Sequence, residues 1–222
     1  MDARDHHEPL PVADEQLTAL SPARLRILAP AKINLNLLVG PLRAGGYHPL
    51  DSVVAKIAFY DELTLCAGEP GQVTFEAEGL PCGPDADNLA VRAAKLMQTL
   101  PESAGRGVTM SLTKRIPPGM GLGGGSSDAA AVLVGLNTLW QLGLDNDALA
   151  TLGAQLGSDV PLFMGPAGLQ MTGRGECIEP LAIHPFAVLL VMPDLHCSTA
   201  AVYAEYDRQP VELAEQLAAS DW

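Results

Sequence analysis

Apolar and polar residues alternate along several short stretches of the chain, a pattern that is typical of half-buried β-strands. The first stretch covers residues 24–39 and is interrupted at Pro30. The same pattern predicts strands at 53–60, 62–66, 72–77 and 108–113, and again at 168–172 and 186–192. Order is therefore expected to begin near Arg24, with strands recurring along most of the chain.

Helical periodicity appears between these strands. Apolar residues recur at helical spacing over 88–100, where Asp87 is the predicted N-cap, and in an amphipathic helix that directly follows Asp128. Further helices are predicted at 147–156 and 211–219, and 158–161 is interpreted as a loop that opens a short helix. Because strands and helices do not alternate strictly, we predict an α+β fold rather than a doubly wound parallel sheet.

Composition and net charge limit the classes of partner that the chain is expected to bind. The chain has 222 residues, of which 48% are hydrophobic and 18% charged, so it can build a packed core. Its net charge of −13 argues against nucleic acid and anionic membranes as partners, since both favour basic surfaces. Anionic small molecules stay compatible with this charge, because backbone amides and a few local cations can hold a phosphate.

The start of the chain and the spacing of its cysteines predict a cytoplasmic protein. Residues 1–22 are expected to form a disordered acidic tail, in which His6 and His7 are a solvated pair. No apolar run is long enough to span a membrane. The four cysteines show no metal-binding spacing and are expected to stay reduced; they are Cys66, Cys82, Cys177 and Cys197.

One glycine-rich segment is the strongest candidate for chemistry. Five of the seven residues 119–125 are glycine, and a predicted helix follows them. Glycines allow positive φ, so successive N–H groups can surround an anion, and a helix that begins near Ser127 adds its positive end. Lys114 adds positive charge just upstream. The predicted phosphate-binding loop consists of Pro117, Pro118, Gly119, Met120, Gly121, Leu122, Gly123, Gly124, Gly125, Ser126 and Ser127.

Three other interpretations of this loop are weaker. A P-loop needs a lysine before its final Ser or Thr, and no lysine lies here. Gly119, Gly121 and Gly124 fit the dinucleotide-binding pattern, but the preceding strand alternates, and Pro117 and Pro118 separate it from the loop. A plain flexible turn has no need of five glycines, each of which costs conformational entropy.

Several motifs in sequence order resemble one family. Residues 117–128 resemble the phosphate-binding motif of the GHMP kinase superfamily, the group of galactokinase, homoserine kinase and mevalonate kinase. Residues 29–35, 45–48 and 156–161 are similar to motifs of the 4-diphosphocytidyl-2-C-methyl-D-erythritol kinases within it, and 193–203 to a later substrate loop. The resemblance extends from about residue 24 to about residue 205.

The resemblance implies a fold and a reaction. The fold would be a ribosomal S5 domain 2-like nucleotide-binding domain at 23–164, followed by an incomplete ferredoxin-like domain at 165–222. The reaction would transfer the γ-phosphoryl of ATP, with Mg2+, to the 2-hydroxyl of a methylerythritol that carries a CDP group, in the non-mevalonate route to isoprenoid precursors. Family members continue past the point that matches Tyr206, so we expect a truncated form that is less stable and less active than a full-length relative.

Two residues would carry the chemistry. Asp159 matches the family's catalytic aspartate and would accept the hydroxyl proton, although an aspartate before Pro161 is also typical of a helix N-cap. Lys32 matches the other active-site residue, and its alternative is a lysine that reaches solvent from the end of a strand. We predict that the two form an ion pair, which orients the base and stabilises developing negative charge.

The resemblance also implies contacts to the CDP-linked substrate. Asn34, on the same strand face as Lys32, would bond it near the reacting hydroxyl, unless it is a plain polar residue of the strand. Tyr47 and His48 resemble the pair that recognises cytidine; the alternative is a turn-packing tyrosine beside a surface histidine. Thr199 and Tyr203 match contacts to the same ligand, and for Tyr203 a core-facing helix position is an equal alternative.

The ATP contacts outside the loop are Asn88 and Lys114, which match positions on the adenine side. Asn88 has an equal alternative as a polar residue at a helix start. No cluster of carboxylates predicts a metal cage, so Mg2+ would be held mainly by the phosphates. The oligomeric state stays open between monomer and homodimer.

Two rival functions follow from the same motifs. Mevalonate- or homoserine-type kinases share the glycine-rich loop, but Tyr47 and His48 argue against them. The other rival is a protein that binds nucleotide and has lost its chemistry, and the presence of both Lys32 and Asp159 argues against that loss.

Overall fold

The computed structural model describes residues 17–21, 23–193 and 199–208, and one sheet runs through them. Its strands are β1 (Leu17–Ser21), β2 (Arg24–Asn34), β3 (Leu38–Val39), β4 (Leu50–Gly68), β5 (Val73–Gly79), β6 (Gly107–Lys114), β7 (Gly168–Gly173) and β8 (Cys177–Pro180). The helices are α1 (Leu89–Gln98), α2 (Gly124–Trp140), α3 (Asn146–Ala154) and α4 (Thr199–Arg208), with short 3-10 helices η2 (Pro101–Ser103) and η3 (Val160–Met164).

The sheet is organised around β4, which is long enough to pair with different strands along its length. β1, β2, β4, β6 and β5 are neighbours in that order, and of the described strand pairs only β5 with β6 is parallel. The first residues of β4 pair with β7, which in turn pairs with β8, whereas its last residues pair with β6. This mainly antiparallel sheet with helices confirms the predicted α+β fold.

A bulge between β2 and β4 explains the interruption at Pro30. The register shifts there, because Pro30 is opposite Tyr60 while Ala31 is opposite Ile57, so two residues of β4 have no counterpart on β2. Proline cannot donate a ladder hydrogen bond and is tolerated at bulges, which bend a strand and re-aim the side chains that follow. The two strands predicted at 53–60 and 62–66 are therefore one bent strand.

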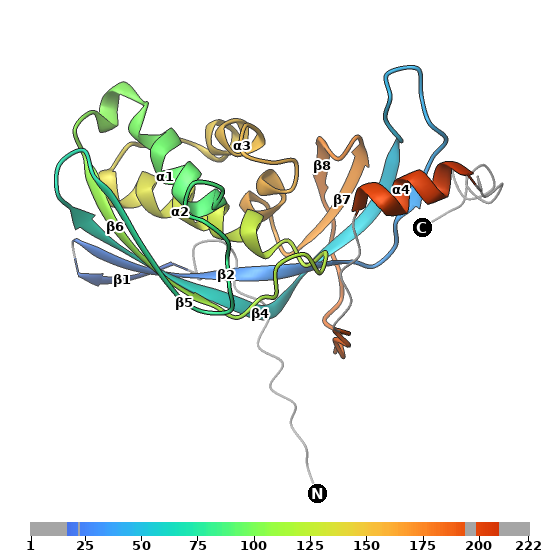
Figure 1. Cartoon of the computed structure of the whole chain (residues 1–222), viewed down its shortest axis with the longest axis horizontal. Coiled ribbons are helices and arrows are strands. Elements are labelled where there is room, and N and C mark those ends of the chain that lie inside the picture. Colours follow the sequence, from blue (N-terminus) through green and yellow to red (C-terminus); the bar gives the residue numbers. More distant parts are fainter. Residues whose placement is uncertain (1–16, 22, 194–198, 209–222) are drawn as a thin grey trace, which may run out of the picture.

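Helices α1, α2 and α3 lie on one face of the sheet (Figure 1). The main core fills the space between α1, α2 and the strands, with Leu63, Leu65 and Met110 fully buried. α2 approaches β2 and β4 most closely at Gly135, where a Cβ would lie 2.4 Å from the Cδ1 atoms of both Ile27 and Leu65. The absence of a side chain at this position therefore sets the distance between helix and sheet.

Most predicted elements are present with shifted ends. The strands predicted at 72–77, 108–113 and 168–172 correspond to β5, β6 and β7, and the helices at 88–100 and 147–156 to α1 and α3. The predicted N-cap Asp87 was wrong, because Asn88 caps α1 by accepting a hydrogen bond from the N–H of Ala90 at 2.9 Å. β8 was not predicted.

The strand predicted at 186–192 was also wrong. These residues form no regular element, and Phe186, Leu189 and Val191 are exposed. Apolar, β-branched residues favour a strand only where a partner strand and a core receive them. Within the described residues no strand pairs with this segment.

The structure also differs from the boundaries expected at the two ends of the first domain. The expected tail of residues 1–22 was too long, because Leu17–Ser21 pair with β2 and Leu17 packs against the core. The boundary expected after residue 164 precedes β7, which pairs with six residues of β4, so the sheet continues beyond it. The division into two domains stays a prediction.

Some predictions lie outside the described residues. They concern residues 1–16 with His6 and His7, Cys197, and the helix predicted at 211–219.

Two further findings concern the described part of the chain. None of its helices combines the length and apolarity that a membrane crossing needs. Cys66, Cys82 and Cys177 are free thiols.

We expect Gly135→Ala to lower the free energy of unfolding by about 1–3 kcal/mol, because the added methyl group overpacks the contact with Ile27 and Leu65. This loss would outweigh the better helix propensity of alanine, which is worth about 1 kcal/mol. Urea unfolding of the parent chain and of the variant measures this change in the free energy of unfolding. Gly125→Ala is the control for stability, since its Cβ meets only Leu89 at 3.9 Å. Equal stability of the two variants would contradict the packing argument.

Candidate active site

The glycine-rich loop connects β6 to α2 and lies against β2. The N–H of Lys32 donates to the carbonyl of Leu122 at 2.9 Å, which ties the middle of the loop to the strand. The side chain of Leu122 is buried with Ala31 and Ile57 in a small apolar cluster, and Met120 packs against the same cluster. The two apolar residues of the loop therefore anchor it, and the glycines are left to shape its backbone.

The glycines adopt conformations that other residues rarely take. Gly119, Gly121 and Gly123 have φ values of 76°, 72° and 69°. A Cβ at Gly123 would lie 2.9 Å from Phe163 and 3.0 Å from Cγ of Lys32, so this position also needs glycine for close approach. The loop is thus in direct contact with the side chain of Lys32 and with η3.

Helix α2 begins at Gly124, three residues before the predicted start near Ser127. The left-handed conformation of Gly123 forms the helix start, and no side chain caps it. The first N–H groups of a helix have no partner within it, and together with the helix dipole they favour an anion. Gly124, Gly125, Ser126 and Ser127 all lie in the first turn, so the loop and the helix end form one candidate phosphate site.

Two polar atoms near this helix end lack partners. Across residues 17–21, 23–193 and 199–208, nothing donates to or accepts from Ser127 Oγ or Asp128 Oδ1, although both atoms are buried. Buried polar groups are normally hydrogen-bonded, so an orphaned hydroxyl beside free N–H groups fits a ligand with phosphate or metal character. The residues present therefore fit the phosphates of a nucleotide, and the contact of Ser127 with phosphate or Mg2+ stays a prediction.

Lys32 and Asp159 meet beside this loop. Lys32 Nζ lies 3.7 Å from Asp159 Oδ2, so the predicted ion pair is confirmed, although the two residues are far apart in the sequence. Lys32 Nζ also donates to Asn34 Oδ1 at 2.8 Å, and Asn34 Nδ2 donates to Ser52 Oγ at 2.7 Å. Ser52 in turn donates to the carbonyl of Asn36. This chain of hydrogen bonds fixes the ammonium; the catalytic roles stay predictions.

The side chain of Asp159 does not act as a helix cap. Asp159 occupies the N-cap position of η3, but its carboxylate makes no capping hydrogen bond. The side chain is 38% exposed and lies beside Lys32, whose own side chain is 12% exposed. Of the two alternatives that the sequence leaves open for Asp159, the geometry favours a free carboxylate at the surface of the site.

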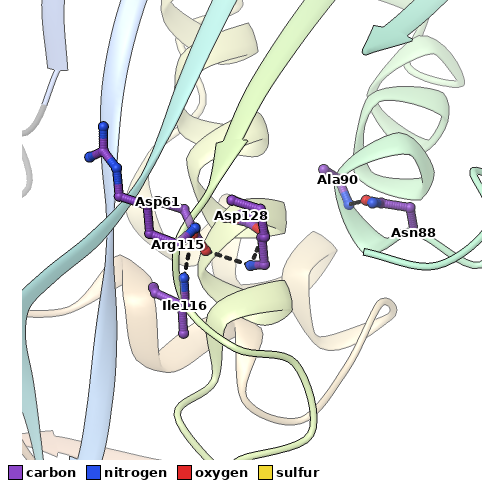
Figure 2. A network of polar contacts seen from close by, with 7 residues as sticks. Asp61, Asn88, Ala90, Arg115, Ile116 and Asp128 are labelled. Carbon is purple, nitrogen blue, oxygen red and sulfur yellow. Dashed lines mark hydrogen bonds and ion pairs between the residues drawn. The ribbon is translucent and has the colours of Figure 1, made fainter. Parts of the chain in front are cut away.

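Lys114 lies in a buried ion network below the loop. Its Nζ donates to Asp61 on β4 and, at 2.6 Å, to Asp128 on α2; Figure 2 shows the two carboxylates converging. The second oxygen of Asp61 accepts from the N–H groups of Arg115 and Ile116 at 2.6 and 2.8 Å. The network joins β4, β6 and α2 at one point, directly before and after the glycine-rich loop.

The network shifts the pKa values of Lys114 and Asp128. Burial alone would lower the pKa of Lys114, but the carboxylates of Asp128 and Asp61 together raise it. Burial raises the pKa of Asp128 to about 7, the charge of Asp61 adds to this, and Lys114 opposes it. The contact of Lys114 with ATP stays a prediction, and its ammonium is already held by two carboxylates.

Asn88 lies at the start of α1, as Figure 2 shows. Its Oδ1 accepts from Ala90, so the helix-end alternative of the sequence is realised. The next residue, Leu89, is the closest neighbour that a Cβ at Gly125 would meet, at 3.9 Å. The start of α1 therefore faces the loop, which is compatible with the predicted adenine contact of Asn88.

Two of the predicted substrate residues, His48 and Tyr203, lie together at the β3–β4 hairpin. The rings of His48 and Tyr203 lie with centroids 5.2 Å apart, which brings α4 against this hairpin. His48 Nδ1 lies 2.9 Å from the carbonyl of Gly40, and Nε2 lies 3.2 Å from Asp207 Oδ1. Both neighbours are oxygen atoms, so His48 has a polar contact on each of its two ring nitrogens.

The ring of Tyr47 has a different neighbour from these two rings. The guanidinium of Arg174, in the turn after β7, lies 4.6 Å from the centroid of the Tyr47 ring. Tyr206 donates to the carbonyl of Val39 and adds a second ring near His48, at 5.6 Å. The sequence did not single out Arg174, Tyr206 or Asp207. The side chain of Thr199 lies outside the described part of the chain.

A second lysine, Lys56, is buried directly opposite Lys32 on the neighbouring strand β4. Its Nζ donates to the carbonyls of Phe163, at 3.1 Å, and Gly165, at the end of η3. Burial lowers the pKa of Lys56 to about 8. Sequence reasoning missed this residue, although a lysine within an apolar stretch is the same signal that singled out Lys32.

We expect Lys114→Met to lower the free energy of unfolding by about 3–5 kcal/mol, because it leaves two buried carboxylates without a counter-ion. Arg115→Met is the matched control, since Arg115 is half exposed and its ion pair with Glu62 spans 3.8 Å. Exposed pairs of this kind contribute at most about 1 kcal/mol. Urea unfolding at neutral pH compares the two variants, and similar losses would show that the network is not stabilising.

We expect the chain to gain stability relative to its Lys56→Met variant as the pH rises. The pKa of Lys56 is about 8 in the folded chain against 10.5 for the ordinary side chain, so the unfolded chain binds more protons between these pH values. The free energy of unfolding then rises with pH. From pH 7 to pH 10 the difference between parent and variant should change by about 2–3 kcal/mol in urea unfolding, at about 1.4 kcal/mol per pKa unit. A difference that is constant with pH would contradict the buried charge.

Comparison with known proteins shows what this sequence and fold are similar to. The GHMP kinases N terminal domain matches residues 88–165, which include the glycine-rich loop and Asp159. A 4-diphosphocytidyl-2-C-methyl-D-erythritol kinase of Xanthomonas axonopodis pv. citri (strain 306) is 43% identical over 191 residues, which cover 84% of this chain and 64% of that protein. The enzyme of that name from Bacillus pumilus (strain SAFR-032) is 44% identical over 191 residues, covering 85% and 66%.

Solved structures agree with this placement. A crystal structure of 4-(cytidine 5'-diphospho)-2C-methyl-D-erythritol kinase matches with a TM-score of 0.69 and 40% identity, covering 81% of this chain and 63% of that one. Mevalonate kinase of L. major matches with a TM-score of 0.59 and 18% identity, which shows the shared fold alone. The chain spans less than two thirds of the length of the curated relatives that it matches. In sequence and in fold, the chain is similar to the GHMP kinases.

Proposed function

We propose that the chain transfers the γ-phosphoryl group of ATP to the 2-hydroxyl of 4-diphosphocytidyl-2-C-methyl-D-erythritol, in the non-mevalonate route to isoprenoid precursors. The observation that carries this proposal is the pair of Lys32 and Asp159 in contact with the glycine-rich loop. The names of relatives at 43–44% identity support the choice of substrate. The reaction would take place in the cytoplasm on small molecules alone.

In this mechanism Asp159 accepts the proton of the attacking hydroxyl. Its carboxylate is exposed enough for a substrate to reach it, and no capping hydrogen bond occupies it. Lys32 holds the carboxylate in place from 3.7 Å and offsets negative charge as it develops on the transferred group. Asn34 keeps the lysine directed at this point and can bond the substrate next to the reacting hydroxyl.

The loop would bind the phosphates through its backbone. The uncapped N–H groups at the start of α2, together with the turns at Gly119, Gly121 and Gly123, favour a bound polyanion in spite of the net charge of −13. Ser126 and Ser127 are the residues that could hold Mg2+, and Ser127 Oγ has no partner among the described residues. Mg2+, when bound, supplies neutralisation of the phosphate charge. Phosphoryl transfer depends mainly on such positioning.

The CDP group would be recognised at the hairpin before β4. The rings of Tyr47, His48 and Tyr203 offer faces against which a cytosine can stack, and His48 is fixed by contacts on both of its nitrogens. Thr199 is the further contact in this proposal. The guanidinium over Tyr47 adds positive charge beside a substrate that carries a diphosphate.

We expect Asp159→Asn and Lys32→Met each to lower kcat by about 10²–10⁴-fold, with smaller effects on KM, because each removes a group that acts in the transition state. The assay measures product formation from ATP and the CDP-linked substrate. Asp145→Asn, which keeps the cap of α3, and Lys95→Met, on the exposed side of α1, are the matched controls and should stay within about twofold of the parent.

The same assay separates the rivals. Turnover with mevalonate or homoserine, without turnover of the CDP-linked substrate, would overturn the proposed substrate. Binding of ATP without transfer to any of the three alcohols would favour the nucleotide-binding protein without chemistry.

A further inference from the structure

We propose that Lys56 is a positioning residue for phosphoryl transfer, which holds η3 and thereby keeps Asp159 against Lys32. This inference rests on the proposed role of Asp159. Lys56 itself does not touch the reacting groups. It acts on the far end of the short helix that follows Asp159.

The helix that carries Asp159 has little support of its own. η3 has five residues, and the hydrogen bonds at its start are long, at 3.2 Å from Val160 to Gly157 and 3.2 Å from Leu162 to Asp159. Short 3-10 helices have poorer hydrogen-bond geometry than α-helices and end in unpaired carbonyls. The position of Asp159 must therefore depend on contacts that η3 makes with the rest of the chain.

Lys56 supplies such a contact from β4, which pairs with β2, β3, β6 and β7. It lies in the middle of β4, is 6% exposed, and donates to the carbonyls of Phe163 and Gly165. The N–H of Lys56 also donates to Ala167 at 2.8 Å, so both the backbone and the side chain of one residue hold the segment that leaves η3. The ammonium also matches the negative end of the helix dipole.

This contact depends on the charge of the buried ammonium, which needs hydrogen-bond acceptors. An ammonium in an apolar environment is costly unless acceptors satisfy its hydrogens, and the two carbonyls satisfy two of three. If η3 moved away, the charge would lose both acceptors. Lys56 and η3 therefore fix each other, whereas a methionine at this position would fill the space but hold neither carbonyl, and η3 would keep only its apolar packing. Near-attack geometry is sensitive to displacements of about 1 Å, which can cost about 10²-fold in rate.

The test combines amide hydrogen exchange with kinetics on the full chain. In Lys56→Met we expect exchange of the amides of Val160 and Leu162 to rise at least about tenfold, while β6 and α2 keep their protection. We expect kcat for the CDP-linked substrate to fall by about 10²-fold and the KM for ATP to change by less than about twofold. Lys95→Met is the control, since it removes an exposed lysine that lies outside the site.

Each outcome decides the proposal. Unchanged exchange at η3, or faster exchange with unchanged kcat, would overturn it. If Lys56→Met does not unfold cooperatively, Lys56→Gln, which keeps a donor without the charge, replaces it with the same expected direction and the same criteria. If the parent chain transfers no phosphoryl group, the proposed function fails by itself, and the exchange data still decide whether Lys56 holds η3.

Discussion

The candidate site depends on where α2 begins, and the buried network of Asp61, Lys114 and Asp128 fixes that point. The three charged groups come from β4, β6 and α2; if the helix moved along the sheet, Asp128 would separate from Lys114, whereas Lys114 and Asp61 would stay paired on neighbouring strands. Because breaking one partner of a buried ion pair costs several kcal/mol, the network resists such a movement far more than apolar contacts alone. Close packing at Gly135 adds a second constraint further along the helix. The loop between β6 and α2 is therefore held at both of its ends.

The side of the site that carries Lys32 depends on the bend in β2 and β4. The bulge at Pro30 lies two residues before Lys32, and the apolar side chains of Ala31 and Ile57, which are opposite each other directly after it, receive Leu122 from the loop. The same short stretch of β2 thus binds the loop through its backbone and carries the lysine that meets Asp159. One local irregularity of the sheet brings together three segments that are distant in the sequence.

Several strands and the glycine-rich loop could be predicted from local patterns, whereas contacts between residues far apart in the sequence could not. Alternation located β6 and β7, and five glycines located the loop, because these signals lie within a few residues of one another. The bulge showed only as an interruption at Pro30. Asp61 and Lys56 carry no motif, and their importance comes from partners more than 50 residues away, so spacing gives no signal for them. The strand predicted at 186–192 shows the opposite case, where local propensity is present but none of the described strands pairs with the segment.

The opposed pair Lys32 and Lys56 shows how the site balances its charges. Like charges directly opposite on neighbouring strands repel each other and destabilise a sheet, and a chain with only 13 basic residues has placed two of them there. The two ends of η3 resolve this conflict, because Asp159 at its start offsets the charge of Lys32 and the carbonyls at its end accept from Lys56. Each lysine needs its own end of η3, so the helix has only one position on the sheet that satisfies both. The repulsion between the two ammonium groups thus becomes a reason for Asp159 to stay in place, and its fixed position follows from the pairing of two strands.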